Sequence, residues 1–214
     1  MAKVALDNDV VAKCAAYSLL PRIATTFGVA HTELGVLGTL LYVIKERHVQ
    51  TASIGGNAAH RNLHEFAAAA EVLEPSEEES QLAARLEEAA LEATLQLDVG
   101  ESQLCAIVVS RNIPILCTGD KRGIRAIERL SLTFAELACL AGRVLPLECL
   151  ILRMLAILQY IELRGTICAS RGTDRAIEIC FQCHQGEGEE QEAIAGLESY
   201  INNIAKDAAK VLSR

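Results

Sequence analysis

The segment DVGESQLCAIVVSRNIPILCTGDKRGIRAIERL, residues 98–130, decides the fold class. Its opening, Asp98-Val-Gly-Glu-Ser, is typical of a helix start, and we expect that helix to run to about Arg111. The apolar run from 113 to 119 is too short for a helix, which indicates a buried strand. A second helix is predicted over 121–130. The segment therefore reads helix, strand, helix, as expected in an α/β protein.

The same alternation extends toward both ends of the chain. Strands are expected at 3–7, 26–30, 113–119 and 143–147, and the other helices at 10–20, 32–47, 58–72, 77–96, 133–142, 149–165, 173–183 and 190–212. Pro146 restricts the last strand to a sheet edge. Strands that alternate with helices imply right-handed crossovers and a mainly parallel sheet. The prediction is a three-layer α/β/α domain at 1–149 followed by a helical extension at 150–214.

The composition limits the class of protein. The 214 residues carry a net charge of −8, 51% of them are apolar, and the aromatic residues are four Tyr and four Phe. This aliphatic content excludes a disordered chain, and the acidic balance argues against a general duplex-DNA binder. Asp7 and Asp9 interrupt any signal-peptide core, and no uncharged stretch reaches the ~18 residues of a membrane helix. We therefore expect a soluble, cytoplasmic protein with no membrane contact.

Eight cysteines raise the question of disulfides. Six stand singly in aliphatic surroundings, as reduced core thiols do: Cys14, Cys105, Cys117, Cys139, Cys149 and Cys168. We expect the cysteines to be reduced. Cys180-Phe-Gln-Cys183-His184 matches a haem-attachment or half-zinc-ribbon spacing, but we predict a helix-borne pair without a cofactor, with a zinc or redox role as the alternative. His60 and His64 are interpreted as surface or helix-packing residues rather than metal ligands.

Four acidic residues mark the ends of predicted elements. Asp7 and Asp120 each directly follow a strand-like run, at the strand ends where an open parallel sheet has its ligand crevice. Asp98 and Glu101 share the first turn of the 98–111 helix, where they can also be an N-cap and its capping-box partner. Asp7 can likewise be a simple helix cap. If the strands are neighbours, like charges about 4 Å apart repel by about 4 kcal/mol at an effective dielectric near 20, so a divalent cation is the expected counter-charge.

Three segments, in this order, resemble the PIN-domain nucleases. Val4–Val10, VALDNDV, is similar to the family's first strand, in which an apolar run ends in Asp, a small polar residue and Asn or Asp. Leu97–Ile107, LDVGESQLCAI, is similar to a helix start with a Gly-Glu pair. Ile115–Arg122, ILCTGDKR, is similar to the last catalytic strand with its Thr-x-Asp ending. The resemblance covers about residues 3–150.

The resemblance implies a hydrolase, a metal-dependent endoribonuclease that cleaves single-stranded RNA by two-metal-type phosphodiester hydrolysis. The implied catalytic residues are Asp7, Glu33, Glu101 and Asp120. The implied ligands of Mg²⁺ or Mn²⁺ are Asp7, Glu101 and Asp120, with Asp98 and Asp9 flanking them. Glu33 corresponds to an acid on an early helix of the family. Gly119 departs from the pattern, because many relatives carry a second acid there, and Asp9 replaces a commoner Asn.

Phosphate binding needs positive charge near these acids. The basic candidates are Lys13, Lys121, Arg122 and Arg125, which lie close in sequence to the acids. The hydroxyl of Thr118 is a further candidate, since it can orient a carboxylate or a phosphate. Each basic residue can instead belong to a solvated helix face.

Two classes of function stay open. The first is a ribonuclease, such as the toxin of a toxin-antitoxin pair or a stress or defence nuclease, with RNA as substrate and an antitoxin or other protein as partner. The second is a binding or scaffold protein that keeps the fold without catalysis and acts through its C-terminal helices. The chain lacks a P-loop and a Gly-x-Ser-x-Gly motif, which excludes a P-loop ATPase and the simplest serine hydrolase.

The C-terminal helices also predict association. Apolar residues follow one another closely there: Leu152, Leu155, Ile157, Leu158 and Ile161. One small domain does not easily cover so much apolar surface, so we expect a homodimer or a stable complex with a partner protein. Light scattering at micromolar concentration measures this, and a monodisperse monomer would contradict it.

Overall fold

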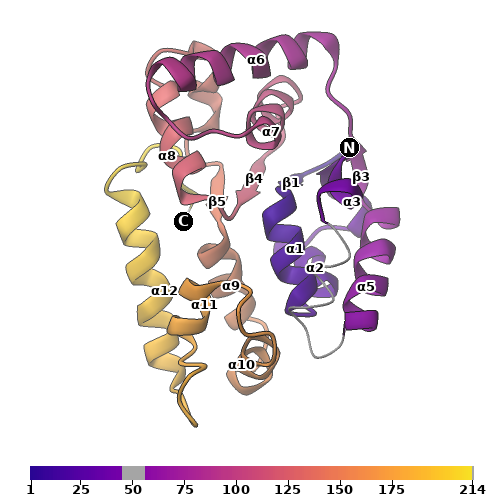
Figure 1. The fold of residues 1–214 in the computed structure, drawn as a ribbon, viewed down its shortest axis with the longest axis vertical. Coiled ribbons are helices and arrows are strands. Elements are labelled where there is room, and N and C mark those ends of the chain that lie inside the picture. The colour runs from indigo at the N-terminus through magenta and orange to yellow at the C-terminus, as the bar shows by residue number, and fades with distance from the viewer. Residues whose placement is uncertain (45–55, 214) are drawn as a thin grey trace.

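The computed structural model describes residues 1–44 and 56–213, which form an α/β fold around a five-stranded sheet. The strands are all parallel and lie in the order β3-β2-β1-β4-β5 (Figure 1). They are β1 Val4–Leu6, β2 Leu34–Leu37, β3 Glu71–Leu73, β4 Ile115–Thr118 and β5 Val144–Pro146. Helices flank the sheet and others follow it at the C-terminus. The predicted fold class is confirmed, and β5 is an edge strand as Pro146 indicated.

Helices cover both faces of the sheet. Successive residues of a strand point to opposite faces, and in this sheet the residues on both faces are buried. Val4 and Leu6 belong to one core cluster and Ala5 to the other. The helices that pack in the first cluster include α1 Asn8–Ala16, α2 Leu20–Phe27, α5 Gly56–Ala69 and α9 Leu147–Leu155. Those that pack in the second include α6 Glu77–Glu92, α7 Val99–Ser110 and α8 Lys121–Leu130. The expected three layers are therefore present.

The C-terminal segment packs against this core. Its remaining helices are α10 Tyr160–Ala169, α11 Arg175–Cys180 and α12 Glu190–Ala205. Leu197 of α12 lies in the first core cluster and Ile204 in the second, so this helix crosses the edge of the sheet. The chain then returns to β5, where Val144 and Leu212 form an isolated parallel bridge. In the described part of the chain, no helix combines the length and apolarity needed to cross a membrane.

The predictions at 26–30 and 32–47 are wrong. Thr26 and Phe27 end α2, which Gly28 terminates with a left-handed φ of 65°. The strand instead lies at Leu34–Leu37, between a short 3₁₀ turn and α3 Leu40–Val43. All four residues of β2 are buried, so they show no alternation, and such a run cannot be told from a helix by periodicity alone. Residues 45–47 of the predicted helix lie outside the described residues.

Other predicted helices are shorter than expected. The helix at 58–72 ends at Ala69, because the next residues form β3. The one predicted at 149–165 is two helices, α9 and α10, separated by a turn in which the Leu158 amide donates to the Met154 carbonyl. At 133–142 there is a 3₁₀ helix rather than an α-helix, Ala135–Leu140. The prediction at 190–212 is too long because residues 211–213 hydrogen-bond to β5.

The prediction that all cysteines are reduced is also wrong. Cys168 on α10 forms a disulfide with Cys183, which follows α11. The Cα atoms lie 5.0 Å apart, within the range of a disulfide, because the two helices pack together. Cys183 is thus no partner for Cys180, which is a buried free thiol whose pKa burial raises to about 11. Sequence spacing missed the pairing because the two cysteines lie on different elements.

Loss of this disulfide should destabilise the protein. The crosslink joins residues separated by 15 positions. Loss of a disulfide that closes a loop of this size lowers the free energy of unfolding by about 3 kcal/mol, because the unfolded chain is no longer constrained. We expect a Cys168→Ala/Cys183→Ala variant, or the parent in dithiothreitol, to unfold at lower urea concentration than the oxidised parent. Cys139→Ala, at a half-buried free cysteine, is the control and should change little. Identical urea midpoints with and without reductant would refute the disulfide.

Candidate functional site

The order of the strands creates a crevice at the centre of the sheet. From β1 the chain builds β2 and β3 on one side, and later places β4 and β5 on the other. The helix after β1 packs on one face and the helix after β4 on the opposite face. This is a topological switch point, where ligands of open α/β sheets bind beyond the carboxyl ends of the strands. A cleft of about 1230 Å³ lies there.

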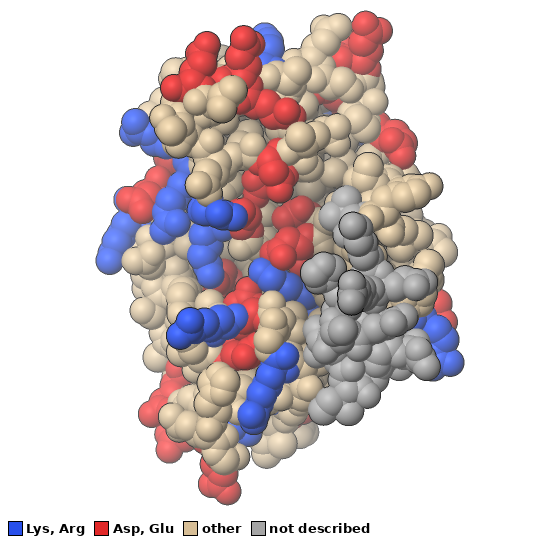
Figure 2. Space-filling view, viewed as in Figure 1, with Lys and Arg blue, Asp and Glu red and all other residues tan. Residues whose placement is uncertain are grey.

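The cleft lining is rich in charge and acidic on balance. Six acidic and four basic residues line it, so its formal net charge is −2. They are Asp7, Asp9, Asp98, Glu101, Asp120 and Asp174, and Lys13, Lys121, Arg122 and Arg125. Figure 2 shows acidic side chains along the middle of this face and basic side chains beside them. Of the residues predicted from sequence to form the site, Glu33 and Thr118 are the two outside this lining.

Asp7 directly follows β1 and is buried at this edge of the sheet. Its Oδ2 accepts a hydrogen bond from Thr118 Oγ1 at 3.1 Å. Although Asp7 occupies the N-cap position of α1, its side chain makes no capping hydrogen bond. The simple cap considered from sequence therefore does not form. Burial, and next the charge of Asp9, raise the pKa of Asp7 to about 6.

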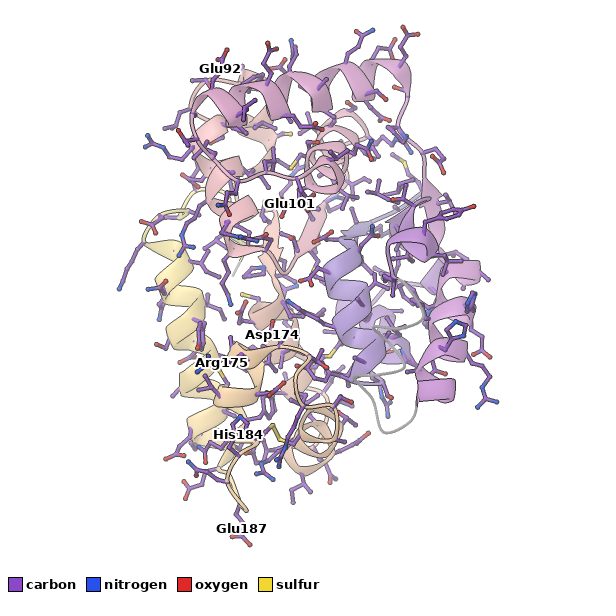
Figure 3. The ribbon with its side chains drawn as sticks, viewed as in Figure 1. Glu92, Glu101, Asp174, Arg175, His184 and Glu187 are labelled. Atoms are coloured by element: carbon purple, nitrogen blue, oxygen red, sulfur yellow. A yellow bond between two sulfur atoms is a disulfide. The ribbon has the colours of Figure 1, made fainter. Side chains whose placement is uncertain are left out.

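Glu101 lies on the first turn of α7, with 5% of its surface exposed (Figure 3). Its Oε2 accepts from the Asp98 amide at 3.0 Å, and its own amide donates to Asp98 Oδ1 at 2.8 Å, which is the capping box that the sequence allows. The other oxygen, Oε1, is buried with no hydrogen-bond partner among the described residues. Burial first, and then the charges of Asp98, Asp120 and Asp7, raise the pKa of Glu101 to about 8. One carboxylate oxygen thus caps the helix while the other is left unsatisfied.

Asp120 follows β4 and caps α8. Its Oδ1 accepts from the Arg122 amide at 2.7 Å, and the Arg122 guanidinium donates to Oδ1 at 3.2 Å and to Oδ2 at 3.0 Å. Burial acts to raise the pKa of Asp120, but these hydrogen bonds and the charge of Arg122 outweigh it, so the pKa is lowered. Asp120 is therefore an ionised carboxylate whose charge is largely balanced within its own helix turn.

Two glycines make room for the carboxylates. A Cβ at Gly123 would overlap the Glu101 carboxylate, and a Cβ at Gly119 would overlap Asp9 Oδ2. At Gly119 the missing side chain lets Asp9, on α1, approach the end of β4.

The structure does not bring Glu33 to this cleft. Glu33 ends the 3₁₀ turn that precedes β2, and its Oε1 lies 2.7 Å from Lys3 Nζ, just before β1. Because β1 and β2 are parallel, these two residues lie at the amino edge of the sheet, opposite Asp7. Glu33 therefore lies in a 3₁₀ turn at the opposite edge of the sheet and does not belong to the acidic cluster.

The basic residues of the cleft are each paired with a carboxylate. The pairs are Lys13 with Asp9 and Asp174, Lys121 with Glu148, Arg122 with Asp120, and Arg125 with Asp207. Burial acts to lower the pKa of Lys13, but its two carboxylate partners outweigh burial and the pKa is raised. Lys13 therefore stays charged although only 17% of its side chain is exposed.

Sequence reasoning missed three residues at this site. Asn8 is buried beside Asp7, and its Oδ1 has no hydrogen-bond partner among the described residues. Its place between Asp7 and Asp9 was the signal available. Asp174 reaches the cleft from the turn before α11, and Glu148 on α9 is a buried residue outside the lining that pairs with Lys121. No local pattern marks these two, because only tertiary packing brings them there.

The donor set suits a hard divalent cation, which takes oxygen ligands. Glu101 Oε1 and Asn8 Oδ1 are buried without a hydrogen-bond partner among the described residues, and burial and neighbouring acids raise the pKa values of Asp7 and Glu101. In the described residues, no three His, Cys, Asp or Glu side chains converge as a ready metal site. Asp120, for example, faces Arg122. The residues fit a cation in kind, and binding would require Asp120 to exchange Arg122 for it.

The histidines on α5 do not extend this site. His60 and His64 contact each other, with Nε2 atoms 3.3 Å apart and ring centroids 4.4 Å apart. They belong to no group of three potential metal ligands within residues 1–44 and 56–213. His64 is exposed, and we keep the interpretation that the two are surface or helix-packing residues.

Comparison with known proteins assigns no family. No protein-family model, no curated protein and no solved structure matches the chain. The functional argument therefore depends on the geometry of the cleft and on the motifs that line it.

Replacing Glu101 by Gln tests the charge imbalance of the cleft. Gln retains the capping oxygen but carries no charge. Because the pKa of Glu101 is raised from 4.5 to about 8 in the folded chain, its ionisation destabilises the fold progressively across that interval. We expect Glu101→Gln in EDTA to exceed the parent by on the order of 2 kcal/mol near pH 9 and to equal it near pH 4. Urea unfolding across this pH range measures the difference.

Glu33→Gln is the matched control. The hydrogen bond from Lys3 lowers the pKa of Glu33, so its negative charge stabilises the fold above its ordinary pKa. Removing that charge should reduce stability at neutral pH, the opposite sign to Glu101→Gln. If Glu101→Gln is as stable as the parent at every pH, the unbalanced charge at Glu101 does not exist.

Proposed function

We propose that this protein is a metal-dependent endoribonuclease of the PIN type that hydrolyses phosphodiester bonds of single-stranded RNA. The observation that carries the proposal is the presence of two buried carboxyls at the switch point, Asp7 and Glu101, whose pKa values are raised by burial and then by the negative charges of neighbouring acids. Unneutralised buried acids are destabilising, so a bound cation would relieve a cost that the folded chain alone bears. The motifs that resemble the PIN nucleases contribute both residues and Asp120.

In this proposal Asp7, Glu101 and Asp120 hold one or two Mg²⁺ or Mn²⁺ ions, with Asp9 and Asp98 flanking them. Bound metal would supply an activated water and neutralise charge on the leaving oxygen. Asp7 and Glu101 must be ionised to act as ligands, so metal binding releases protons and strengthens as pH rises through about 6 to 8.

The remaining residues act on orientation and on the phosphates. Thr118 donates to Asp7 Oδ2, and its Oγ1 also accepts from the Asp120 amide at 3.2 Å. It therefore fixes two of the acids relative to each other. The basic side chains on the cleft wall are proposed to hold the RNA phosphates: Lys13, Lys121, Arg122 and Arg125.

The second candidate is a PIN-like binding or scaffold protein without catalysis. The observation that favours it is the two-pronged contact of Arg122 with Asp120, which neutralises one of the acids without any metal. If that contact persists in solution with excess divalent ion, the acidic edge is a structural remnant. For the active protein, a cytoplasmic toxin or a stress or defence nuclease is the biological role that fits, with an antitoxin or another protein as partner.

The proposal predicts loss of cleavage when an acid of the cleft is neutralised. Asp7→Asn or Asp120→Asn should reduce Mn²⁺- or Mg²⁺-dependent cleavage of a single-stranded RNA by on the order of 100-fold or more. Asp7→Asn should remain folded, with stability in EDTA equal to or above that of the parent. The pKa of the Asp7 carboxyl is raised in the folded chain, so its ionised form destabilises the fold and Asn removes that charge. Gel analysis of a labelled RNA measures cleavage, with EDTA as the metal-free control.

Glu33→Gln separates the structural assignment from the sequence-based one. Glu33 lies at the opposite edge of the sheet, so this variant should cleave as the parent does. If Glu33→Gln is inactive and Asp7→Asn is active, the site lies elsewhere. If the parent shows no metal-dependent cleavage at all, the scaffold candidate replaces the nuclease.

A further inference from the structure

Three of the four basic residues of the cleft are held by carboxylates on or after α9, two of them in the C-terminal segment. Glu148 on α9 pairs with Lys121, Asp174 before α11 pairs with Lys13, and Asp207 after α12 pairs with Arg125. These acids come from three different elements. Two of them, Asp174 and Asp207, lie outside residues 3–150, so part of the wall of the cleft takes its arrangement from residues beyond the segment with nuclease-like motifs.

Among the ion pairs in which both residues line the cleft, the pair of Lys13 and Asp174 has the least exposed side chains. Lys13 Nζ lies 2.8 Å from Asp174 Oδ2 and 2.7 Å from Asp9 Oδ2. The side chains of Lys13 and Asp174 are 17% and 13% exposed, and both residues line the cleft. An ammonium group has three N–H donors, so one remains after these two contacts for a phosphate oxygen. The two carboxylates hold the ammonium in one place at the cleft wall.

Asp174 is itself fixed by a separate set of bonds. Its Oδ1 caps α11, accepting from the amides of Ala176 at 2.9 Å and Ile177 at 3.1 Å. Its Oδ2 is therefore free to serve Lys13. Each oxygen of the carboxylate has its own partner, so the capping role and the contact with Lys13 can be separated by substitution.

The turn that carries Asp174 is docked on α1, the helix that carries Lys13. Ser170 Oγ donates to the Ala16 carbonyl at 2.7 Å, and both residues are buried. Thr173 Oγ1 donates back to the Ser170 carbonyl at 2.7 Å. Cys168 precedes this turn and Cys183 follows it, so their disulfide links the two ends of the segment that contains the turn. The position of Asp174 is thus set by bonds that do not involve the cleft.

We propose that Asp174 is a positioning residue for substrate binding: from the C-terminal segment, it holds Lys13 in place to receive an RNA phosphate. The proposal rests on the proposed nuclease function and adds the C-terminal segment to its site. A lysine held in advance loses less conformational freedom when the phosphate arrives, which improves binding of the substrate. The acids that are proposed to hold metal are untouched, so the rate at saturating RNA does not depend on Asp174.

Simple electrostatics gives the opposite sign, which makes the direction of the effect decisive. If Asp174 merely added negative charge near the RNA backbone, it would repel the phosphates. Its neutralisation would then tighten RNA binding. If Asp174 positions Lys13, its neutralisation weakens binding even though the cleft becomes less negative.

The test is Asp174→Asn, which keeps an oxygen to cap α11 and removes the charge that holds Lys13. We expect KM for a single-stranded RNA to rise on the order of fivefold while kcat stays within about twofold. Lys13→Met should raise KM as much or more. In the double variant Lys13→Met/Asp174→Asn, KM should equal that of Lys13→Met alone, because Asp174 acts only through Lys13.

Asp207→Asn is the matched control. It also removes a C-terminal carboxylate from a basic residue of the cleft, Arg125, but Asp207 is 61% exposed, and an exposed pair contributes little. Its KM should stay within about twofold of the parent. Thermal unfolding of each variant monitors the fold. Asp174→Ser, which caps the helix without contacting Lys13 as a carboxylate does, provides a second variant if Asp174→Asn does not fold.

The outcomes separate this inference from the function on which it rests. If the parent cleaves RNA and Asp174→Asn has an unchanged or lowered KM, or if the double variant shows additive effects, the positioning role is overturned and the nuclease stands. If the parent binds a fluorescent single-stranded oligoribonucleotide without cleaving it, the nuclease is overturned, and the same comparison made with Kd decides the role of Asp174. If the parent neither binds nor cleaves, both are overturned.

Discussion

The pairing of β1 with β4 at the middle of the sheet is the constraint on which the site depends. It places Leu6 beside Cys117, and the amide of Asp7 donates to the Cys117 carbonyl at 2.9 Å. The carboxyl ends of two strands that are far apart in sequence therefore meet. Everything proposed for the cleft, from the Thr118 hydrogen bond to the approach of Asp9 to Gly119, follows from this alignment.

This alignment brings more acidic than basic side chains to the cleft. The basic residues of the cleft are already paired, and one of them, Arg122, balances only Asp120. Asp7 and Glu101 are left with raised pKa values, and Glu101 Oε1 has no partner in the described part of the chain. Such an arrangement lowers the stability of the protein alone and favours whatever brings positive charge. Strained or unbalanced groups of this kind cluster at functional sites.

The C-terminal segment contributes to both stability and the site. α12 joins the two core clusters, and the last residues hydrogen-bond to β5, so this segment completes the edge of the sheet. The same packing carries Asp174 to the cleft wall and Glu148 to Lys121, which lines the cleft. The disulfide and the Ser170 hydrogen bond fix the turn that bears Asp174. A segment that looks like an appendage in the sequence is therefore part of the wall that faces the acids.

The sequence by itself determined the fold class and the edge position of β5, allowed the capping box of Asp98 with Glu101, and placed Asp7 and Asp120 directly after strands. These depend on local signals: short apolar runs, cap residues, and acids placed directly after strands. The pairing of β1 with β4 that brings those strand ends together was decided by the tertiary structure. It misplaced β2 and hence Glu33, because a strand buried on both faces has no periodicity to distinguish it from a helix. It also missed the disulfide, Glu148 and Asp174. Only the tertiary structure decided these, since contacts between residues distant in sequence arise from packing and leave no local pattern in the chain.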